Sequence, residues 1–275
     1  MPIRVAAEPT FRDVLAGTAR AQIGMWVCSG SALVAEICAG SGLDWLLIDT
    51  EHSPNGLEST LSQLQAVHGY PIVPLVRVPA GERVIVKQLL DLGAQNLLIP
   101  MIDTAEQARE MAAAVRYAPL GVRGVGSALA RASRWNRIDD YLARADDTIS
   151  LFVQIETTDA VANIAQIAAV DGIDGLFIGP SDLAASMGLL GQQDHPDVVA
   201  SVEQCIRTVS ALGKPAGVNA FEPATAERYL AAGARFVLVG ADVAVLARAS
   251  EKLAATFIKP GTTGPAVDAV PRPSY

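Results

Sequence analysis

Charged residues, and lysine above all, are scarce in this chain of 275 residues. Only 18% of the residues are charged, there are four lysines, the net charge is −8 and the pI is about 4.9. An acidic chain without a lysine-rich run is a poor partner for nucleic acids and for anionic membranes, so we expect a small-molecule partner. A typical chain has about 25% charged residues, and the deficit predicts that part of the surface is buried in a homo-oligomer.

Cysteine and long apolar runs are also limited. The three cysteines, Cys28, Cys38 and Cys205, are odd in number and form no CxxC motif, which argues against a disulfide framework and a zinc knuckle. We interpret them as buried structural thiols. Residues 1–13 lack the apolar segment of a signal peptide, and no run approaches the ~18 apolar residues that span a membrane. The sequence therefore predicts a cytoplasmic protein.

Eight short apolar runs recur along the chain with alanine-rich helical patterns between them. The runs read IGMWV, WLLID, PLVRV, NLLIP, LFVQI, GLFIG, PAGVN and RFVLVG. Continuous rather than alternating apolar character is typical of parallel strands that are covered on both faces. A Rossmann-type sheet is the structural alternative, but no GxGxxG motif follows the first run. The pattern therefore predicts an α/β fold, the (β/α)8 TIM barrel.

Helices are expected between these runs, at residues 31–39, 57–67, 83–92, 104–117, 158–168, 196–212, 223–232 and 242–257. The segment 119–136, PLGVRGVGSALARASRWN, is too long for an ordinary connection, and we predict an ordered functional or subunit-contacting loop. Residues 258–275 are rich in proline and glycine, which indicates a flexible arm or a strap across a neighbouring subunit. We expect residues 1–257 to form a single barrel domain.

Polar side chains follow the ends of the apolar runs far more often than they precede their starts. In a barrel of this type the chemistry lies at the carboxyl ends of the strands, so these side chains should converge at one mouth. Taken alone, several of them have ordinary explanations as helix caps or solvated acids. The candidate residues are Asp49, Glu51 and His52 after the second run, Arg77 in the third, Gln154 and Glu156 after the fifth, Asp182 after the sixth and Asn219 at the end of the seventh.

Arg77 and the turn GPSDL both indicate an anion at this mouth. A buried arginine is costly without a negative partner, which for Arg77 is either a structural carboxylate, Glu156 or Asp49, or a substrate carboxylate or enolate. The GPSDL turn leads from a strand into a helix whose free backbone N–H groups suit a carboxylate or a phosphate. An ordinary connection capped by Ser181 or Asp182 is the alternative for that turn.

Carbon–carbon bond chemistry in such a barrel needs an electron sink, either a lysine imine or a divalent metal. None of the four lysines falls at the carboxyl end of a run, so the imine lacks a nucleophile. Glu156 and Asp182 follow consecutive runs and together offer oxygen ligands, which suit Mg²⁺, Mn²⁺ or Co²⁺. His52 is the one histidine that follows a strand end, and we expect it to act as acid or base, oriented by a neighbouring acid such as Asp49.

Six separated motifs between residues 22 and 257 resemble the HpcH/HpaI family of metal-dependent (class II) pyruvate aldolases. They are WLLIDTEHSPN, PLVRV, KQLLDLGAQNLLIPM, GVRGVGSALARASRWN, VQIET and GLFIGPSDLA, and they occur in the family's order. The resemblance implies a (β/α)8 barrel, a hexamer built from trimers with a swapped C-terminal helix, and no organic cofactor. It also implies reversible cleavage of 4-hydroxy-2-oxo acids, such as 4-hydroxy-2-oxoheptanedioate, to pyruvate and an aldehyde, such as succinic semialdehyde.

The resemblance also implies a role for individual residues. By the matching motifs, Glu156 and Asp182 bind the metal, Arg77 binds the keto or enolate oxygen and His52 is the general base. Asp49 orients His52, Asp91 reaches a neighbouring subunit's site, Gln154 lies beside the metal, and the Gly179 and Ser181 amides hold the pyruvate carboxylate.

The aldehyde half of the substrate is left open by the sequence. Asn219 and Phe221 follow the seventh run and are candidates for contacting the aldehyde, although both also fit as packing or loop residues. Arginines in the long loop, Arg123, Arg131, Arg134 and Arg137, offer a site for a distal carboxylate or else a subunit contact. The alternatives are a sugar-acid aldolase of the 2-dehydro-3-deoxyglucarate type, a citrate-lyase-β-like coenzyme A thioester lyase and a non-catalytic ligand-binding barrel.

Overall fold

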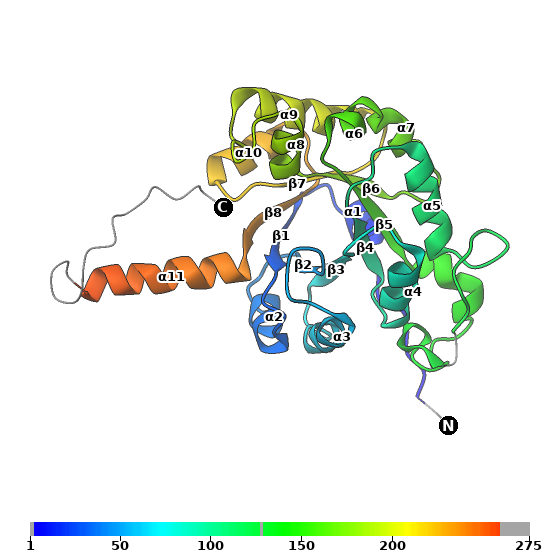
Figure 1. Cartoon of the computed structure of the whole chain (residues 1–275). Helices are drawn as coiled ribbons and strands as arrows, with labels where there is room; N and C mark the ends of the chain where they lie inside the picture. Colours follow the sequence, from blue (N-terminus) through cyan, green and yellow to red (C-terminus); the bar gives the residue numbers. More distant parts are fainter. Residues whose placement is uncertain (1–2, 127–128, 259–275) are drawn as a thin grey trace.

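The computed structural model describes residues 3–126 and 129–258, and its centre is a closed barrel of eight parallel strands in the order β1 to β8 (Figure 1). This confirms the predicted (β/α)8 fold. Each strand pairs with the next in sequence, and β8 closes the barrel on β1. The strands are β1 (Gln22–Val27), β2 (Trp45–Asp49), β3 (Val73–Arg77), β4 (Asn96–Ile99), β5 (Ser150–Ile155), β6 (Gly175–Ile178), β7 (Ala216–Asn219) and β8 (Phe236–Ala241).

Helices follow the strands and cover the outside of the barrel (Figure 1). Their apolar faces pack against the outer faces of the strands, so that both faces of the sheet are buried. The helices are α1 (Phe11–Gly17), α2 (Ala32–Ala39), α3 (Leu57–Ala66), α4 (Arg83–Asp91), α5 (Ala105–Val115), α6 (Thr158–Ala162), α7 (Ile164–Ala168), α8 (Pro180–Ser186), α9 (Pro196–Ala211), α10 (Pro223–Ala231) and α11 (Asp242–Phe257).

The interior of the barrel is filled by large aromatic side chains. Phe236 packs edge-on against Trp45 at a centroid distance of 5.8 Å and against Phe152 at 5.3 Å. Two glycines make room for these rings: a β-carbon on Gly24 would lie 2.6 Å from the Trp45 indole, and one on Gly217 would lie 2.1 Å from the Phe236 ring. The barrel is therefore a packed core, and ligands are confined to its ends.

Helix α1, which the sequence pattern did not predict, closes the end of the barrel where the strands begin. Its Phe11 side chain is fully buried, and the ring lies 5.2 Å from Trp45 and 5.5 Å from Phe236. Thr10 begins the helix with a capping box to Asp13, a short local signal that has no apolar periodicity around it. This plug leaves the opposite end, where the strands finish, as the open mouth.

Other differences from the predicted helices are local. The helix predicted over residues 158–168 is two helices, α6 and α7, that meet at Asn163, and α8 is the helix into which the GPSDL turn was expected to lead. The long segment contains a 3-10 turn, Arg131–Ser133, and a 3-10 helix, Tyr141–Thr148, follows it before β5. Residues 127–128 of that loop and residues 259–275 of the predicted tail lie outside the described residues.

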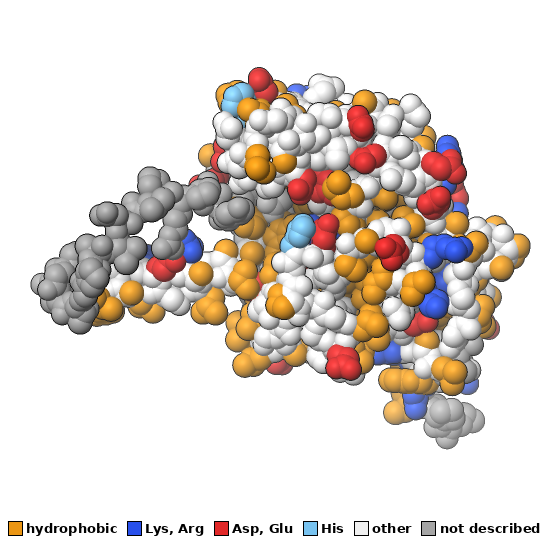
Figure 2. Space-filling view, viewed as in Figure 1, with side chains coloured by type: hydrophobic (Ala, Val, Ile, Leu, Met, Phe, Trp, Pro, Cys, Tyr) orange, Lys and Arg blue, Asp and Glu red, His pale blue; other side chains and the backbone are white. Residues whose placement is uncertain are grey.

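Helix α11 projects away from the barrel (Figure 1), and hydrophobic side chains are spread along it (Figure 2). Leu246 is 66% exposed, Leu253 is 62% exposed and Phe257 is 79% exposed. A helix with this much apolar surface in water lacks the packing that normally stabilises it. Among the described residues, no helix is long and apolar enough to cross a membrane.

Candidate active site at the barrel mouth

The ends of β2 and β3 place two acids around one arginine. Asp49 and Arg77 are partners in the strand register, and Arg77 Nε donates to Asp49 Oδ1 at 2.8 Å. Glu51 Oε2 lies 2.7 Å from Arg77 Nη1, and the guanidinium carbon lies 4.3 Å from the centre of the Trp26 ring. Arg77 is therefore held by Asp49 and Glu51, while its Nη2 has no hydrogen-bond partner within the described ranges.

His52 lies at the same mouth with a side chain that is 67% exposed. The predicted orientation of its ring by Asp49 differs from the structure, because the Asp49 carboxylate accepts from the backbone N–H groups of Glu51 and His52 instead. The acid nearest the imidazole is Glu51, whose Oε2 lies 3.8 Å from His52 Nε2. Burial raises the pKa of Glu51 above its ordinary value, and Arg77 opposes that rise.

Glu156 follows β5 and is nearly fully buried, with 2% of its surface exposed. Its Oε1 accepts from the Met101 backbone N–H at 2.7 Å, and its Oε2 accepts from the Gln154 side-chain amide. Burial raises the pKa of Glu156 to about 7, and the negative charge of Asp182 adds to the effect. A carboxylate in this position lacks a positive partner within the described residues, which makes its charged form costly.

Asp182 is exposed and lies in the first turn of α8, directly after β6. Because β6 pairs with β5, Asp182 comes from the strand end next to that of Glu156, and its negative charge contributes to the raised pKa of Glu156. Gly179 leaves room for the Glu156 carboxylate, because a β-carbon at this position would lie 2.6 Å from Glu156 Oε2. Its own N–H already donates to Ile155 O at 3.0 Å, so the predicted use of the Gly179 amide for a substrate carboxylate does not fit this structure.

Glu156 and Asp182 fit a divalent cation that prefers oxygen ligands. Two acids whose charges oppose each other are stabilised by a cation between them, and Gln154 contributes a buried Oε1 without a hydrogen-bond partner in the described part of the chain. No group of three or more His, Cys, Asp or Glu side chains in the described ranges is arranged to hold a metal ion. The remaining ligands of a metal ion bound by Glu156 and Asp182 would therefore come from water or substrate.

Asn219 ends β7 and accepts a hydrogen bond from Trp26 Nε1 at 2.7 Å. A cavity of about 50 Å³ beside it is lined by Ser181, Phe221 and the acids Asp194 and Glu222, without a lysine or arginine. The cavity adjoins the mouth because Asn219 is the last residue of β7 and Ser181 follows β6. Its acidic lining opposes a second carboxylate on the aldehyde.

Arginines of the long loop lie away from this mouth in the same chain. Arg123 is buried and donates to Asp91, the last residue of α4, at 3.2 Å. Because α4 leads into the start of β4, Asp91 lies toward the end of the barrel opposite the mouth. Arg131 binds the Leu92 carbonyl in the same region. A role for Asp91 at an active site therefore requires a second copy of the chain.

Two contributors to the mouth were not singled out by the strand-end pattern. Trp26 is inside an ordinary apolar run, and only the structure reveals that it contacts both Arg77 and Asn219. Met101 supplies a backbone N–H to Glu156 from a left-handed conformation with φ of 54°. That conformation is uncommon for a residue with a side chain, and nothing in the sequence letters identifies it.

An eight-stranded parallel barrel whose polar side chains gather where the strands end has the layout of a (β/α)8-barrel enzyme. Residues 22–249 match the family model described as HpcH/HpaI aldolase/citrate lyase, and the chain belongs to this family.

Named relatives agree with this assignment. The chain is 54% identical over 260 residues to a hydroxypyruvate/pyruvate aldolase of Deinococcus radiodurans, and the match covers 94% of each chain. It is 53% identical over 247 residues to a 4-hydroxy-2-oxo-heptane-1,7-dioate aldolase of Salmonella dublin, covering 90% of this chain and 94% of the relative. A crystal structure of a family protein from Burkholderia cenocepacia superposes with a TM-score of 0.84 at 38% identity, covering 88% of this chain and 96% of the other. The chain is therefore an aldolase, a carbon–carbon lyase.

Proposed function

We propose that this protein is a divalent-metal-dependent aldolase that reversibly cleaves 4-hydroxy-2-oxo acids to pyruvate and an aldehyde. The observation that carries the proposal is the buried Glu156 carboxylate, whose pKa is raised to about 7 beside Asp182 at neighbouring strand ends. Arg77 and His52 belong to the same mouth, so a cation-binding acid pair, an anion-binding group and a base are available to one substrate.

Glu156 and Asp182 would hold the cation, with Gln154 beside them. A bound Mg²⁺, Mn²⁺ or Co²⁺ would supply a Lewis acid that favours the enolate form of pyruvate. Oxygen ligands do not distinguish strongly among these three ions, so all three are candidates. The proposed mechanism requires no organic cofactor.

Each remaining side chain has a separate role in the proposed cleavage. His52, exposed at the mouth, takes the proton of the 4-hydroxyl group, directly or through water, as the C3–C4 bond breaks. The electrons of that bond become the enolate of pyruvate, and the free Nη2 of Arg77 donates to its oxygen. The proton taken up by His52 is then delivered to C3, directly or through water, and yields pyruvate. Glu51 and Asp49 keep Arg77 in place, and the Ser181 amide is available to the substrate carboxylate.

Exchange of the pyruvate methyl protons in D₂O, followed by NMR, tests this proposal without a choice of aldehyde. Metal-stripped protein should be inactive, and activity should return with Mg²⁺, Mn²⁺ or Co²⁺. The His52→Ala and Glu156→Gln variants should lose at least about 100-fold of the rate, the scale of a lost acid–base or electrostatic group. A folded, metal-loaded wild-type protein without exchange would contradict the enolate mechanism and would favour a thioester lyase or a non-catalytic barrel.

The identity of the aldehyde depends on the residues around the mouth. The cavity beside Asn219 favours an uncharged, hydroxyl-bearing aldehyde over succinic semialdehyde. Asp194 and Glu222 line this cavity, and no lysine or arginine of the described residues lines it. Arg77 is held by Asp49 and Glu51. Aldol addition to pyruvate should therefore show a higher kcat/KM with glyceraldehyde or glycolaldehyde than with succinic semialdehyde. The opposite order would indicate that a second subunit supplies a cation and would support the heptanedioate reaction. Sugar-acid substrates of the 2-dehydro-3-deoxyglucarate type remain the related alternative.

We further infer that the enzyme is a homo-oligomer, a hexamer in which α11 is exchanged between subunits. The exposed apolar residues of α11 and the position of Asp91 away from its own mouth support this inference. In such an assembly, Asp91 of one subunit would approach the mouth of another. We also predict that residues 1–257 form one barrel domain and that the protein is cytoplasmic.

A further inference from the structure

The end of the barrel opposite the mouth has a groove that the proposed reaction does not use. Its cavity volume is about 410 Å³, and it lies between the turn after α3, the turn after α4 and the 3-10 turn Arg131–Ser133. His68, Gln95, Arg131 and Arg134 are among the side chains that line it. Strands β3 and β4 begin here, so the groove is separated from Glu156 and Asp182 of the same chain by the packed interior of the barrel.

Arg134 is half-buried in this region and its guanidinium forms no hydrogen bond or ion pair with any residue in 3–126 or 129–258. Burial lowers the pKa of Arg134, and the charge of Glu8 opposes the decrease. Arg131 is its neighbour and donates to the Leu92 carbonyl at 2.7 Å, which caps the C-terminus of α4. Burial, and then the charge of Arg134, lowers the pKa of Arg131 to about 10.

Both guanidinium groups approach one small residue. A β-carbon on Gly93 would lie 2.8 Å from Arg131 Nη1 and 3.5 Å from Arg134 Nη1. Two arginines that approach the same point repel each other, and an anion between them would remove that repulsion. Glu8 is the sole acid that lines the groove in the described structure, and it is exposed. The groove is therefore locally positive on a chain with a net charge of −8.

The backbone that presents Arg134 is held in an uncommon conformation. Arg134, Trp135 and Asn136 have φ angles of 49°, 55° and 61°, so three consecutive residues with side chains are left-handed. Ser133 holds this turn through its carbonyl, which accepts from Arg137 N at 3.0 Å, and through its hydroxyl, which accepts from Asn136 N at 3.1 Å. Such backbone strain persists where the surroundings enforce it and is concentrated at ligand-binding positions.

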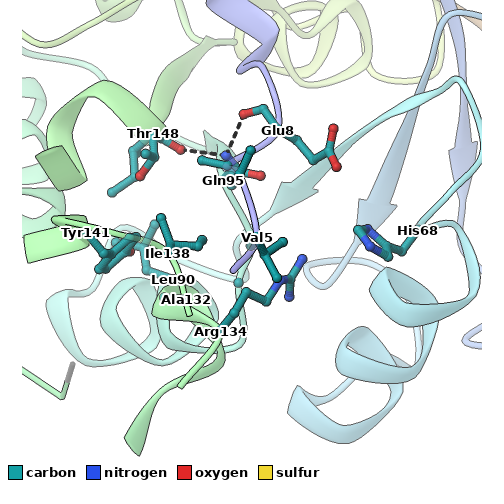
Figure 3. A pocket seen from close by; sticks show the side chains of 15 residues that line it. Val5, Glu8, His68, Leu90, Gln95, Ala132, Arg134, Ile138, Tyr141 and Thr148 are labelled. Atoms are coloured by element: carbon teal, nitrogen blue, oxygen red, sulfur yellow. Dashed lines mark hydrogen bonds between the residues drawn. The ribbon is translucent and has the colours of Figure 1, made fainter. Parts of the chain in front are cut away.

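We propose that this groove is a second binding site for a small oxyanion, a carboxylate or a phosphate, held by Arg134 and Arg131. Figure 3 shows Arg134 and His68 on two sides of the adjoining pocket, which Glu8 also lines, and the Glu8 carbonyl accepts a hydrogen bond from Gln95. The planar guanidinium of Arg134 binds either anion with two N–H groups, and His68 provides a further donor from the facing segment.

Calorimetric titration of inorganic phosphate, and separately of acetate, into the Mg²⁺-loaded full-length protein tests the proposal. Saturating pyruvate keeps the probe from the mouth, and the ionic strength is held constant. Arg134→Gln should weaken the tighter of the two probes at least tenfold, and Arg134→Lys should weaken it by less, because the charge is kept and the planar group is lost. Arg137→Gln removes the same charge from an exposed neighbour and should stay within twofold of the wild type.

Several results would overturn the proposal. The wild type could show no saturable binding of either probe, Arg134→Gln and Arg137→Gln could weaken binding equally, or Arg77→Lys at the mouth could abolish it. Sedimentation of the Arg134→Gln variant gives one more decisive outcome: a smaller assembly with unchanged anion affinity would assign Arg134 to a contact with a neighbouring subunit. Circular dichroism and the melting temperature confirm that each variant is folded.

Discussion

Arg77 and Asp49 form a buried ion pair across the neighbouring strands β3 and β2, with 2.8 Å between Nε and Oδ1. Their side chains are 7% and 2% exposed. Removing one partner of a buried pair leaves the other charge uncompensated, which is the costly half of such an interaction.

Asp49→Asn should therefore destabilise the protein by about 2–3 kcal/mol, less than the loss of a sole partner because Glu51 still contacts Arg77. Urea denaturation of the metal-free protein measures the change. Asp171→Asn is the matched control, since Asp171 pairs with Arg116 at 2.7 Å but is 90% exposed, and it should cost less than about 1 kcal/mol. Equal effects of the two substitutions would contradict a buried role for the Asp49 pair.

Stability of the metal-free protein should fall as the pH rises from about 4.5 to 7. Glu156 has a pKa near 7 in the folded state and near 4.5 when unfolded, so the folded state holds the proton more tightly and loses this advantage as the pH rises through that window. The loss is at most about 3 kcal/mol. Glu156→Gln should flatten the pH dependence in thermal or urea denaturation, and Glu106→Gln, at an exposed site, should not.

Saturating Mg²⁺ should reduce this loss of stability between about pH 4.5 and 7, because a bound cation stabilises the charged Glu156 carboxylate and lowers its folded-state pKa. The measurement is the melting temperature of the wild type and of Glu156→Gln with and without the metal. A Mg²⁺ effect of equal size in both proteins would show that the cation binds away from Glu156.

Gly179→Ala should weaken metal binding at least about tenfold while the barrel stays folded, since ligand-shell changes have costs on this scale. The added β-carbon would lie 2.6 Å from Glu156 Oε2 and must displace that carboxylate. Gly17→Ala is the control, because a β-carbon there meets nothing within 4 Å. Titration of Mn²⁺ followed by electron paramagnetic resonance measures both affinities, and unchanged binding by Gly179→Ala would move the metal away from this carboxylate.

Leu253→Asp on α11 should reduce the molecular mass of the assembly, because a charge would enter the apolar surface that we expect a second subunit to cover. Ser250→Asp places the same charge on the same helix at a polar position. Size-exclusion chromatography with light scattering distinguishes the two variants. An unchanged mass for Leu253→Asp would argue that α11 lies outside the subunit interface.

The sequence by itself determined the barrel. Apolar runs with helical patterns between them specify buried parallel strands, and the same runs locate Asp49, Arg77, Glu156 and Asp182 at strand ends, because position relative to a strand end is a local property of the chain. The family motifs added the expected reaction. The sequence pattern did not predict helix α1, because a seven-residue helix has too few turns to show apolar periodicity.

Only the tertiary structure decided which of these groups meet. Arg77 binds Asp49 and Glu51, although the sequence also allowed Glu156. The Asp49 carboxylate contacts the backbone of His52, and Glu51 is the acid nearest its ring. The pKa of Glu156 depends on burial and on Asp182, 26 residues away along the chain. Arg123 and Arg131 of the long loop lie toward the end of the barrel opposite the mouth, whereas the sequence left open both a substrate contact and a subunit contact. Side-chain partners and burial are set by the packing of distant segments, and a sequence pattern reports only what is near in the chain.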